Sequence, residues 1–214
     1  MKKISYAAAI AAMLSVSSTF VSAQSFKDTF DSNSLEWTEC AYENNSGKAI
    51  IDKGFLNIES KGENKALGAF IGEQVGQNTS FKTHCYAPID VMKPFKVRTN
   101  VTIQKLAVDR ITGLIFNYKD DGNFYTFTFN NEMVSFLRFE NYALVGKIEQ
   151  GIKWAKKSKL DQQWELVSDG NELTFFVDGM QVIKVKYMPL SYSGIGFYTF
   201  GKQELKVDDI EFIQ

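Results

Sequence analysis

The carboxylates closest to a catalytic arrangement lie near the end of the chain, at Asp208, Asp209 and Glu211. Side chains two residues apart on a strand point to the same face, so Asp209 and Glu211 are expected to share one. A pair of facing carboxylates can hydrolyse a glycosidic bond, one as acid and the other as base or nucleophile. A solvated strand edge is the alternative interpretation, and the sequence favours it over a catalytic pair.

A second group of oxygen atoms lies in the turn Asp120-Asp121-Gly122-Asn123. Calcium takes about six to eight oxygen ligands, and Asp120, Asp121 and Asn123 supply only a few. An ordinary turn is therefore favoured over a Ca²⁺ site, and no other cofactor is indicated. His84, the only histidine, has Cys85 beside it but no further ligand nearby, so we expect a surface or loop histidine. A Ser-His-Asp site would depend on His84 alone, and no serine has a nucleophile-elbow motif around it.

Aromatic residues and one arginine offer a different chemistry, the recognition of sugars. Sugar rings present apolar C–H faces that stack on aromatic side chains, while a few polar groups fix their orientation. An arginine inside an apolar strand pattern either caps a sheet edge or lies in a groove where it can bind a partner. Taken singly, each candidate is more often a packing residue than a ligand contact. The ligand-binding candidates are Tyr118, Tyr125, Arg138, Trp154 and Tyr198.

The first residues read as a signal peptide. Lys2 and Lys3 precede an apolar stretch, and Val21 and Ala23 occupy the small-residue positions before a cleavage point. We predict a signal peptide over 1–23 and an exported chain, periplasmic or extracellular in a bacterium. No later segment is apolar enough to cross a bilayer, so no membrane span is expected after signal removal.

Only two cysteines occur, Cys40 and Cys85. An even pair in an oxidising compartment is commonly bridged, so a disulfide between them is predicted. Two buried free thiols are the alternative, because cysteine packs readily in cores.

The mature chain of about 190 residues has the size of one domain, predicted to span 24–214. Removing Lys2 and Lys3 changes the formal charge from -1 to about -3. Without a basic excess or a recognised motif, nucleic acid is not expected as a partner.

Strands and tight turns account for the rest of the sequence. The stretch Trp164–Val182 holds two turn signals, Asp169-Gly170-Asn171 and Asp178-Gly179, which predict three antiparallel strands. No helix longer than a turn or two is convincing, and 62–79 reads as a loop. The alternation of apolar and polar residues predicts the remaining strands over 26–30, 49–51, 55–58, 95–103, 113–118, 124–129, 133–139, 144–152, 194–200 and 205–213.

Several of these strands are apolar on both faces. Leu114, Phe116 and Tyr118 are expected on one side with Ile115 on the other. A two-sheet sandwich needs only one apolar face per strand, so the extra aromatics must face outer loops or a ligand. Long aromatic strands with short turns predict an all-β, two-sheet antiparallel jelly-roll sandwich.

Three segments together resemble the concanavalin A-like lectin/glucanase superfamily, on its laminin-G-like side. They are GLIFNYKDDGNFYTFTF (113–129), WELVSDGNELTFFVDGMQV (164–182) and GIGFYTFGKQELKVDDIEF (194–212). The resemblance implies that the first strand lies antiparallel beside the last. It also implies that Asp208 and Asp209 are mainly fold residues at a strand end or bulge.

The resemblance leaves three functions open. Laminarinase-type relatives carry Glu-x-Asp-x-x-Glu on one strand, and no glutamate in this chain is followed two residues later by an aspartate. A non-catalytic carbohydrate-binding protein is therefore favoured over an enzyme. A glycoside hydrolase-like enzyme, similar to 3-keto-disaccharide hydrolases, is the first alternative. A protein-interaction domain with a partner in the cell envelope is the second.

Overall fold

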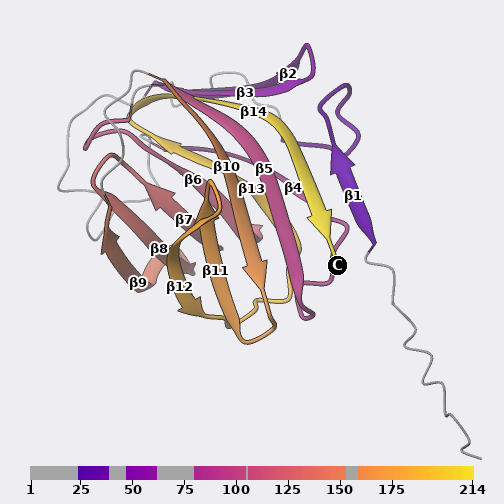
Figure 1. Ribbon diagram of the computed structural model, residues 1–214, viewed down its shortest axis with the longest axis vertical. Helices are drawn as coiled ribbons and strands as arrows, with labels where there is room; N and C mark the ends of the chain where they lie inside the picture. Colours follow the sequence, from indigo (N-terminus) through magenta and orange to yellow (C-terminus); the bar gives the residue numbers. More distant parts are fainter. Residues whose placement is uncertain (1–23, 39–46, 62–79, 105, 153–158) are drawn as a thin grey trace, which may run out of the picture.

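The chain folds into two antiparallel β-sheets stacked face to face (Figure 1). The computed structural model describes residues 24–38, 47–61, 80–104, 106–152 and 159–214. The described residues form fourteen strands and no helix, and hence no helix long and apolar enough to cross a membrane. The predicted all-β sandwich is confirmed, while the predicted signal peptide lies outside the described residues.

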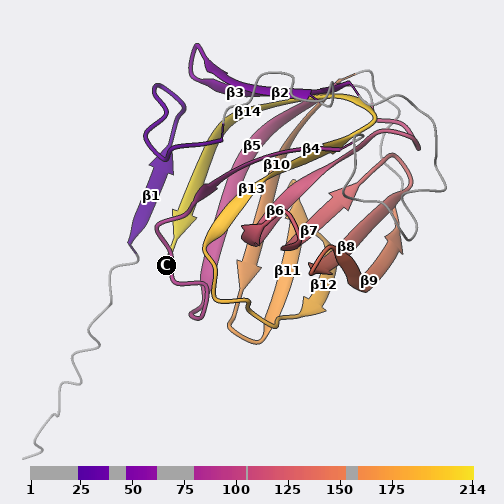
Figure 2. The same ribbon diagram turned by 180° about the vertical axis from the view of Figure 1, so that it is seen from behind.

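The larger sheet has eight strands and the smaller has six. In spatial order the larger contains β12 (Met180–Lys186), β11 (Glu172–Val177), β10 (Lys159–Ser168), β5 (Phe95–Gln104), β14 (Lys202–Ile213), β3 (Phe55–Lys61) and β2 (Gly47–Asp52), with β1 (Ser25–Asp28) also paired to β14. The smaller contains β4 (Ser80–Tyr86), β13 (Gly194–Phe200), β6 (Ile111–Asp120), β7 (Asn123–Phe129), β8 (Met133–Glu140) and β9 (Ala143–Gly151). Figure 2 shows the same two layers from behind.

The hairpins form where the sequence places residues that tolerate a positive φ. Asp178 and Gly179 have φ of 51° and 76°, which is the left-handed pair that a tight hairpin turn requires. Lys53 and Gly54, at 53° and 72°, make the same kind of turn between β2 and β3. The three antiparallel strands predicted around Trp164–Val182 are β10, β11 and β12.

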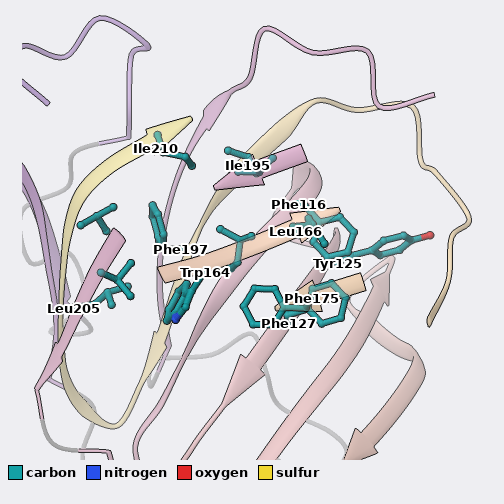
Figure 3. Close-up of a cluster of buried hydrophobic side chains, with 14 of the residues drawn as sticks. Phe116, Tyr125, Phe127, Trp164, Leu166, Phe175, Ile195, Phe197, Leu205 and Ile210 are labelled. Carbon is teal, nitrogen blue, oxygen red and sulfur yellow. The ribbon is translucent and has the colours of Figure 1, made fainter. Parts of the chain in front are cut away.

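The main core fills the space between the sheets (Figure 3). Trp164 is fully buried, and the Phe129 ring of the opposite sheet meets it edge-on at 4.8 Å. The Phe127 and Phe175 rings stack across the layers with 5.1 Å between centroids. Burying one such ring contributes roughly 1.5–3 kcal/mol, so these contacts are the main force that holds the sheets together.

The six-stranded sheet is apolar on its outer face as well. Seven residues form this second buried cluster: Ile111, Ile115, Tyr118, Phe124, Leu137, Phe139 and Tyr198. The prediction of strands with two apolar faces is thus confirmed. The expectation that Tyr118 shares a face with Leu114 and Phe116 is wrong, because Asn117 has a positive φ of 50° and interrupts the alternation of β6.

Strand β4 was not predicted from the sequence, and His84 lies within it rather than on a loop. Only Phe81, Thr83 and Cys85 face the core, while Lys82 and His84 occupy the outer face. Among the described strands the partner of β4 is β13, and β4 forms an edge of its sheet. The outer face of β4 is polar, and Phe81 is the one aromatic residue on its core-facing side. The alternation of apolar and polar residues was therefore too weak to predict a strand.

The two ends of the described chain meet. Phe26 pairs with Phe212, and the backbones of Gln24 and Gln214 exchange two hydrogen bonds of 2.7 and 2.9 Å. β1 and the end of β14 accordingly lie side by side in both views (Figures 1 and 2). This confirms the pairing of first and last strands, and the register shift between Val207 and Asp209 is the bulge expected there.

Candidate functional site

The outer face of the eight-stranded sheet is polar, because its outward rows hold side chains that can hydrogen bond. One row joins Gln163, Asn100 and Asp209 across β10, β5 and β14. The next row joins Asp161, Thr102 and Lys206. Neighbouring strands lie about 4.8 Å apart, so each row presents polar groups at that spacing.

Apart from Asp209, the residues of these two rows line a hollow of about 590 Å³, here called the polar hollow. Gln104 and Lys206 also line a second hollow of about 320 Å³ toward β3. The residues around the polar hollow are Phe55, Asn100, Val101, Thr102, Gln104, Lys159, Asp161, Gln162, Gln163, Asp178, Lys206 and Asp208. Two lysines and three aspartates among them nearly balance in charge, so the surface suits an uncharged ligand.

Hydrogen bonds fix the side chains of the polar hollow in place. Gln163 Nε2 donates to Asn100 Oδ1 at 3.2 Å, and Asn100 Nδ2 donates to Asp209 Oδ1 at 3.0 Å. Thr102 Oγ1 donates to Asp161 Oδ1 at 2.6 Å. The hollow also has one aromatic wall, Phe55, whose ring lies 3.2 Å from Lys206 Nζ. The side chains are thus arranged before any ligand arrives.

Of the three carboxylates considered for catalysis, Asp209 and Glu211 are paired with cations and Asp208 lines the polar hollow. Asp209 forms an ion pair with Lys27 at 2.8 Å, and its hydrogen bond raises the pKa of that lysine. Glu211 lies 3.6 Å from an Arg98 guanidinium nitrogen. Asp208, displaced by the bulge, is the neighbour that lines the hollow.

A second charged cluster lies on the outer face of the six-stranded sheet, at the turn predicted as an ordinary turn or a calcium site. Asp120 Oδ1 accepts from Gly122 N at 2.9 Å and from Asn123 Nδ2 at 2.8 Å, which is the hydrogen bonding of a turn. Within the described ranges no group of three or more His, Cys, Asp or Glu residues could hold a metal.

Asp121 takes part in a different set of contacts. Its Oδ1 accepts from Tyr118 Oη at 3.1 Å and pairs with Lys82 Nζ at 2.8 Å. Burial would raise the pKa of Asp121, but the Lys82 hydrogen bond and charge outweigh it and hold that pKa below its usual value. Burial, and then the Asp121 charge, raise the pKa of Tyr118. The phenol therefore stays protonated and donates to the carboxylate.

His84 stacks on the Tyr118 ring with 3.9 Å between centroids. Burial lowers the pKa of His84, Asp121 opposes that shift, and Lys82 adds to it. The imidazole is consequently neutral at pH 7.

The other ligand-binding candidates are placed in the interior or are paired. Tyr125 and Tyr198 are each 1% exposed, and Tyr125 Oη donates to the carbonyl of Met188. Arg138 forms an ion pair with Glu140 and lies 5.7 Å from the Tyr125 ring. Trp154 lies outside the described residues, as does Cys40.

Cys85 is a buried free thiol in the structure. Burial first, and the Asp28 charge second, raise its pKa. Because Cys40 is not among the described residues, the Cys40–Cys85 disulfide stays a prediction.

Sequence reasoning missed the polar hollow and the part that Lys82 and His84 play. Asn100 and Thr102 fall within the strand predicted over 95–103, but neither they nor Gln163 were predicted as ligand-binding residues. The available signal was that the outward positions of β5 and β10 are polar with the exception of Val167. Their lateral pairing, which brings the polar sides together, connects residues about sixty positions apart.

No protein-family model and no curated protein sequence matches the chain. Solved structures do match. The carbohydrate-binding module CBM66 from Bacillus subtilis is 16% identical, with a TM-score of 0.55 over 81% of this chain and 94% of that one. A Bacillus licheniformis beta-glucanase is 11% identical, with a TM-score of 0.58 over 88% and 97%. A prokaryotic beta-1,3-1,4-glucanase (lichenase) derived from a mouse hindgut metagenome is 11% identical, with a TM-score of 0.59 over 88% and 98%.

These likenesses define the fold. The chain has the concanavalin A-like jelly-roll sandwich, as the resemblance in its strand and turn segments implied. At such low identities the likeness extends to the architecture alone, and the function has to be argued from the site.

Proposed function

We propose that this protein is a non-catalytic carbohydrate-binding protein that holds a neutral glycan in the polar hollow. The observation that carries the proposal is the two rows of fixed polar side chains across β10, β5 and β14, above all Gln163 and Asn100 in one row and Thr102 in the next. Sugar hydroxyls both donate and accept hydrogen bonds, and amide and hydroxyl side chains can accept from them and donate to them. Phe55 adds an aromatic wall for a C–H face.

The fold of the neighbours supports this ligand class. One is a carbohydrate-binding module, and two are glucanases. We further propose, on the N-terminal sequence pattern, that the chain is exported from a bacterial cell and meets its glycan in the periplasm or outside.

The test is a glycan array with the mature chain, followed by calorimetric titration of the oligosaccharides that bind. Gln163→Ala should weaken binding about tenfold, the effect of losing one well-placed hydrogen bond. Lys186→Ala, on an exposed position of β12 outside the hollow, is the matched control and should bind normally. Loss on Arg138→Ala or Trp154→Ala but not on Gln163→Ala would place the glycan elsewhere. An array without any binding glycan, together with capture of an envelope protein, would favour the protein-interaction alternative.

A glycoside hydrolase is the second candidate, because Asp161 and Asp208 bring two carboxylates to the polar hollow. An enzyme would release new reducing ends from the glycans that bind, and Asp208→Asn would abolish that release while leaving binding. Asp209→Asn and Glu211→Gln test the other two carboxylates in the same assay. Binding without any product on a broad panel would exclude this candidate.

A further inference from the structure

The outer face of the six-stranded sheet carries a second group of residues that could bind a ligand, at its β4 edge. Lys82, His84 and Tyr86 alternate with the core-facing residues of β4, and the turn after β6 brings Asp121 beside them. This group lies on the opposite sheet from the polar hollow. Stacked sheets are about 10 Å apart, so one sugar ring cannot touch both.

Asp121 is a carboxylate that is fixed in position yet open to solvent. Both of its contacts, from Lys82 Nζ at 2.8 Å and Tyr118 Oη at 3.1 Å, reach Oδ1. The side chain remains 64% exposed, and Oδ2 receives no hydrogen bond from the described residues. A carboxylate oxygen held in this way can accept from a ligand hydroxyl without losing side-chain entropy on binding.

Tyr86 supplies an exposed aromatic ring on the same outer face of β4 as Lys82, the ion-pair partner of this carboxylate. It is 59% exposed, and its ring meets His84 edge-on at 6.1 Å with an interplanar angle of 88°. His84 is itself held by stacking on Tyr118. Gly194 and Gly196 of β13, which pair with Tyr86 and His84, bring no side chains into this part of the sheet.

An exposed aromatic ring and a fixed acceptor on one face of a sheet match the two surfaces of a pyranose. The apolar C–H face stacks on the ring, and the hydroxyls at its edge meet polar groups. Lys82 is already neutralised by Asp121, so it offers no free charge to an acidic sugar. The ligand chemistry is that of a neutral sugar ring.

We propose that Tyr86, His84 and Asp121 form a second sugar-binding site, which takes a single neutral pyranose. Tyr86 stacks on the ring, Asp121 Oδ2 accepts from a hydroxyl, and an imidazole nitrogen of His84 bonds a neighbouring hydroxyl. The site rests on the proposed function only for the chemical class of its ligand. With two sites on opposite sheets, one molecule can hold two glycan chains.

The test is a titration of the isotope-labelled mature chain with methyl glycosides of glucose, galactose and mannose, followed by amide NMR shifts. At least one glycoside should shift the amides of Ser80–Tyr86 and of Asp121. Tyr86→Ala should weaken that binding about tenfold or more, while Tyr86→Phe, which keeps the ring, should retain it. Asp121→Ala should weaken it as well.

Three results would overturn the second site. They are the absence of shifts along β4 with every glycoside, unchanged affinity in Tyr86→Ala, and equal loss in Tyr86→Phe and Tyr86→Ala. Gln163→Ala separates the two proposals, since it disturbs the polar hollow and should leave the β4 shifts unchanged. Shifts at Asn100 and Gln163 with oligosaccharides would support the proposed function even if β4 never responds.

Discussion

At the scale of single residues, the surroundings of Cys85 lower the reactivity of its side chain. It is 1% exposed, and burial and Asp28 both raise its pKa. Only the thiolate attacks a disulfide reagent. In reduced, folded protein Cys85 should therefore react with Ellman's reagent far more slowly than in urea, where it should react within minutes. Equal rates in the two conditions would contradict the buried environment.

The same reagent tests the predicted bridge to Cys40. Unreduced protein that carries the disulfide should release no chromophore in urea, whereas two free cysteines should release two equivalents. Full reduction before unfolding, which must give two equivalents in either case, is the control. Two equivalents from the unreduced protein would exclude the disulfide and leave Cys85 as a packing residue.

His84 gives the protein a pH dependence with a definite sign. Its folded pKa lies below the ordinary value of 6.5, so the unfolded state takes up the proton first as pH falls. Where the unfolded state binds more protons, stability rises with pH. The effect of His84 on the free energy of unfolding is absent at a pH above its unfolded-state pKa. It destabilises the fold below that pKa and reaches its full size once the pH is below the folded-state pKa.

The comparison of wild type with His84→Gln isolates this effect from the carboxylates. The difference in Tm should move in favour of the variant as the pH is lowered from about 7.5 to about 5.5, the range in which histidine titrates. Asp121, Lys82, Tyr86 and Tyr118 surround the imidazole, and Asp121 titrates only at lower pH because its pKa is lowered. A difference in Tm that is constant across this range would contradict the assignment.

At the scale of elements, one carboxylate organises the turn that follows β1. Asp28 is 3% exposed, and it accepts from Phe30 N at 2.9 Å and from Trp37 Nε1 at 3.0 Å. Phe30 has a positive φ of 56°, which this hydrogen bond helps to hold. Asp28→Ala should lower the free energy of unfolding by about 2–4 kcal/mol, because two buried donors lose their acceptor. Urea denaturation measures it.

Asp28→Asn is the matched variant for this turn. Its amide keeps one acceptor oxygen, so it should retain one of the two hydrogen bonds and fall between wild type and Asp28→Ala. If Asp28→Ala were as stable as wild type, the carboxylate would not be holding the turn.

Elements with local signals were predictable from the sequence, and those that depend on a partner strand were not. Asp178-Gly179 specifies its hairpin through backbone preference alone, and the pairing of Phe26 with Phe212 followed from the family resemblance. The interruption at Asn117 carries no such signal, since an asparagine with positive φ looks like any other strand residue. It turns Tyr118 to the outer face, where it meets His84 and Asp121.

The candidate sites were less predictable than the fold. Tyr118 and Asp121 stood out in the sequence as an aromatic and a turn carboxylate. Asn100 and Gln163 did not, because a polar residue at an alternating position is indistinguishable from a solvated one until the neighbouring strand is known. They become candidate ligand-binding residues only because β10, β5 and β14 pair side by side. These strands are far apart in the sequence.

At the scale of the whole molecule, the two sheets present different outer faces. The eight-stranded sheet is polar and hollowed, while the six-stranded sheet carries a second buried apolar cluster. The chain passes from the smaller sheet to the larger at Gly201, between β13 and β14. Gly201 has a φ of 74°, and a Cβ there would lie 2.3 Å from the carbonyl oxygen of Asp109. Any other residue would be strained at this crossover.

Because the two ends of the described chain meet, we expect the fold to tolerate a change in the order of its strands. Gln24 and Gln214 already exchange backbone hydrogen bonds, so a short Gly-Ser linker can join them without moving β1 or β14. New ends placed between Gly170 and Asn171 open an exposed turn, where a Cβ at Gly170 would meet nothing within 4 Å. This circular permutant should fold with an unfolding free energy within about 1–2 kcal/mol of the parent, because closing one loop offsets opening another. Urea denaturation and far-UV circular dichroism measure this, and glycan titration should give the parental affinity.

A second permutant, opened between Phe200 and Gly201, is the control. It should be much less stable, since Ser60 Oγ donates a hydrogen bond to the Gly201 carbonyl at 2.7 Å within the crossover. Equal stability of the two permutants, or failure of the first to fold, would show that the sandwich depends on chain order more than on the pairing of its ends.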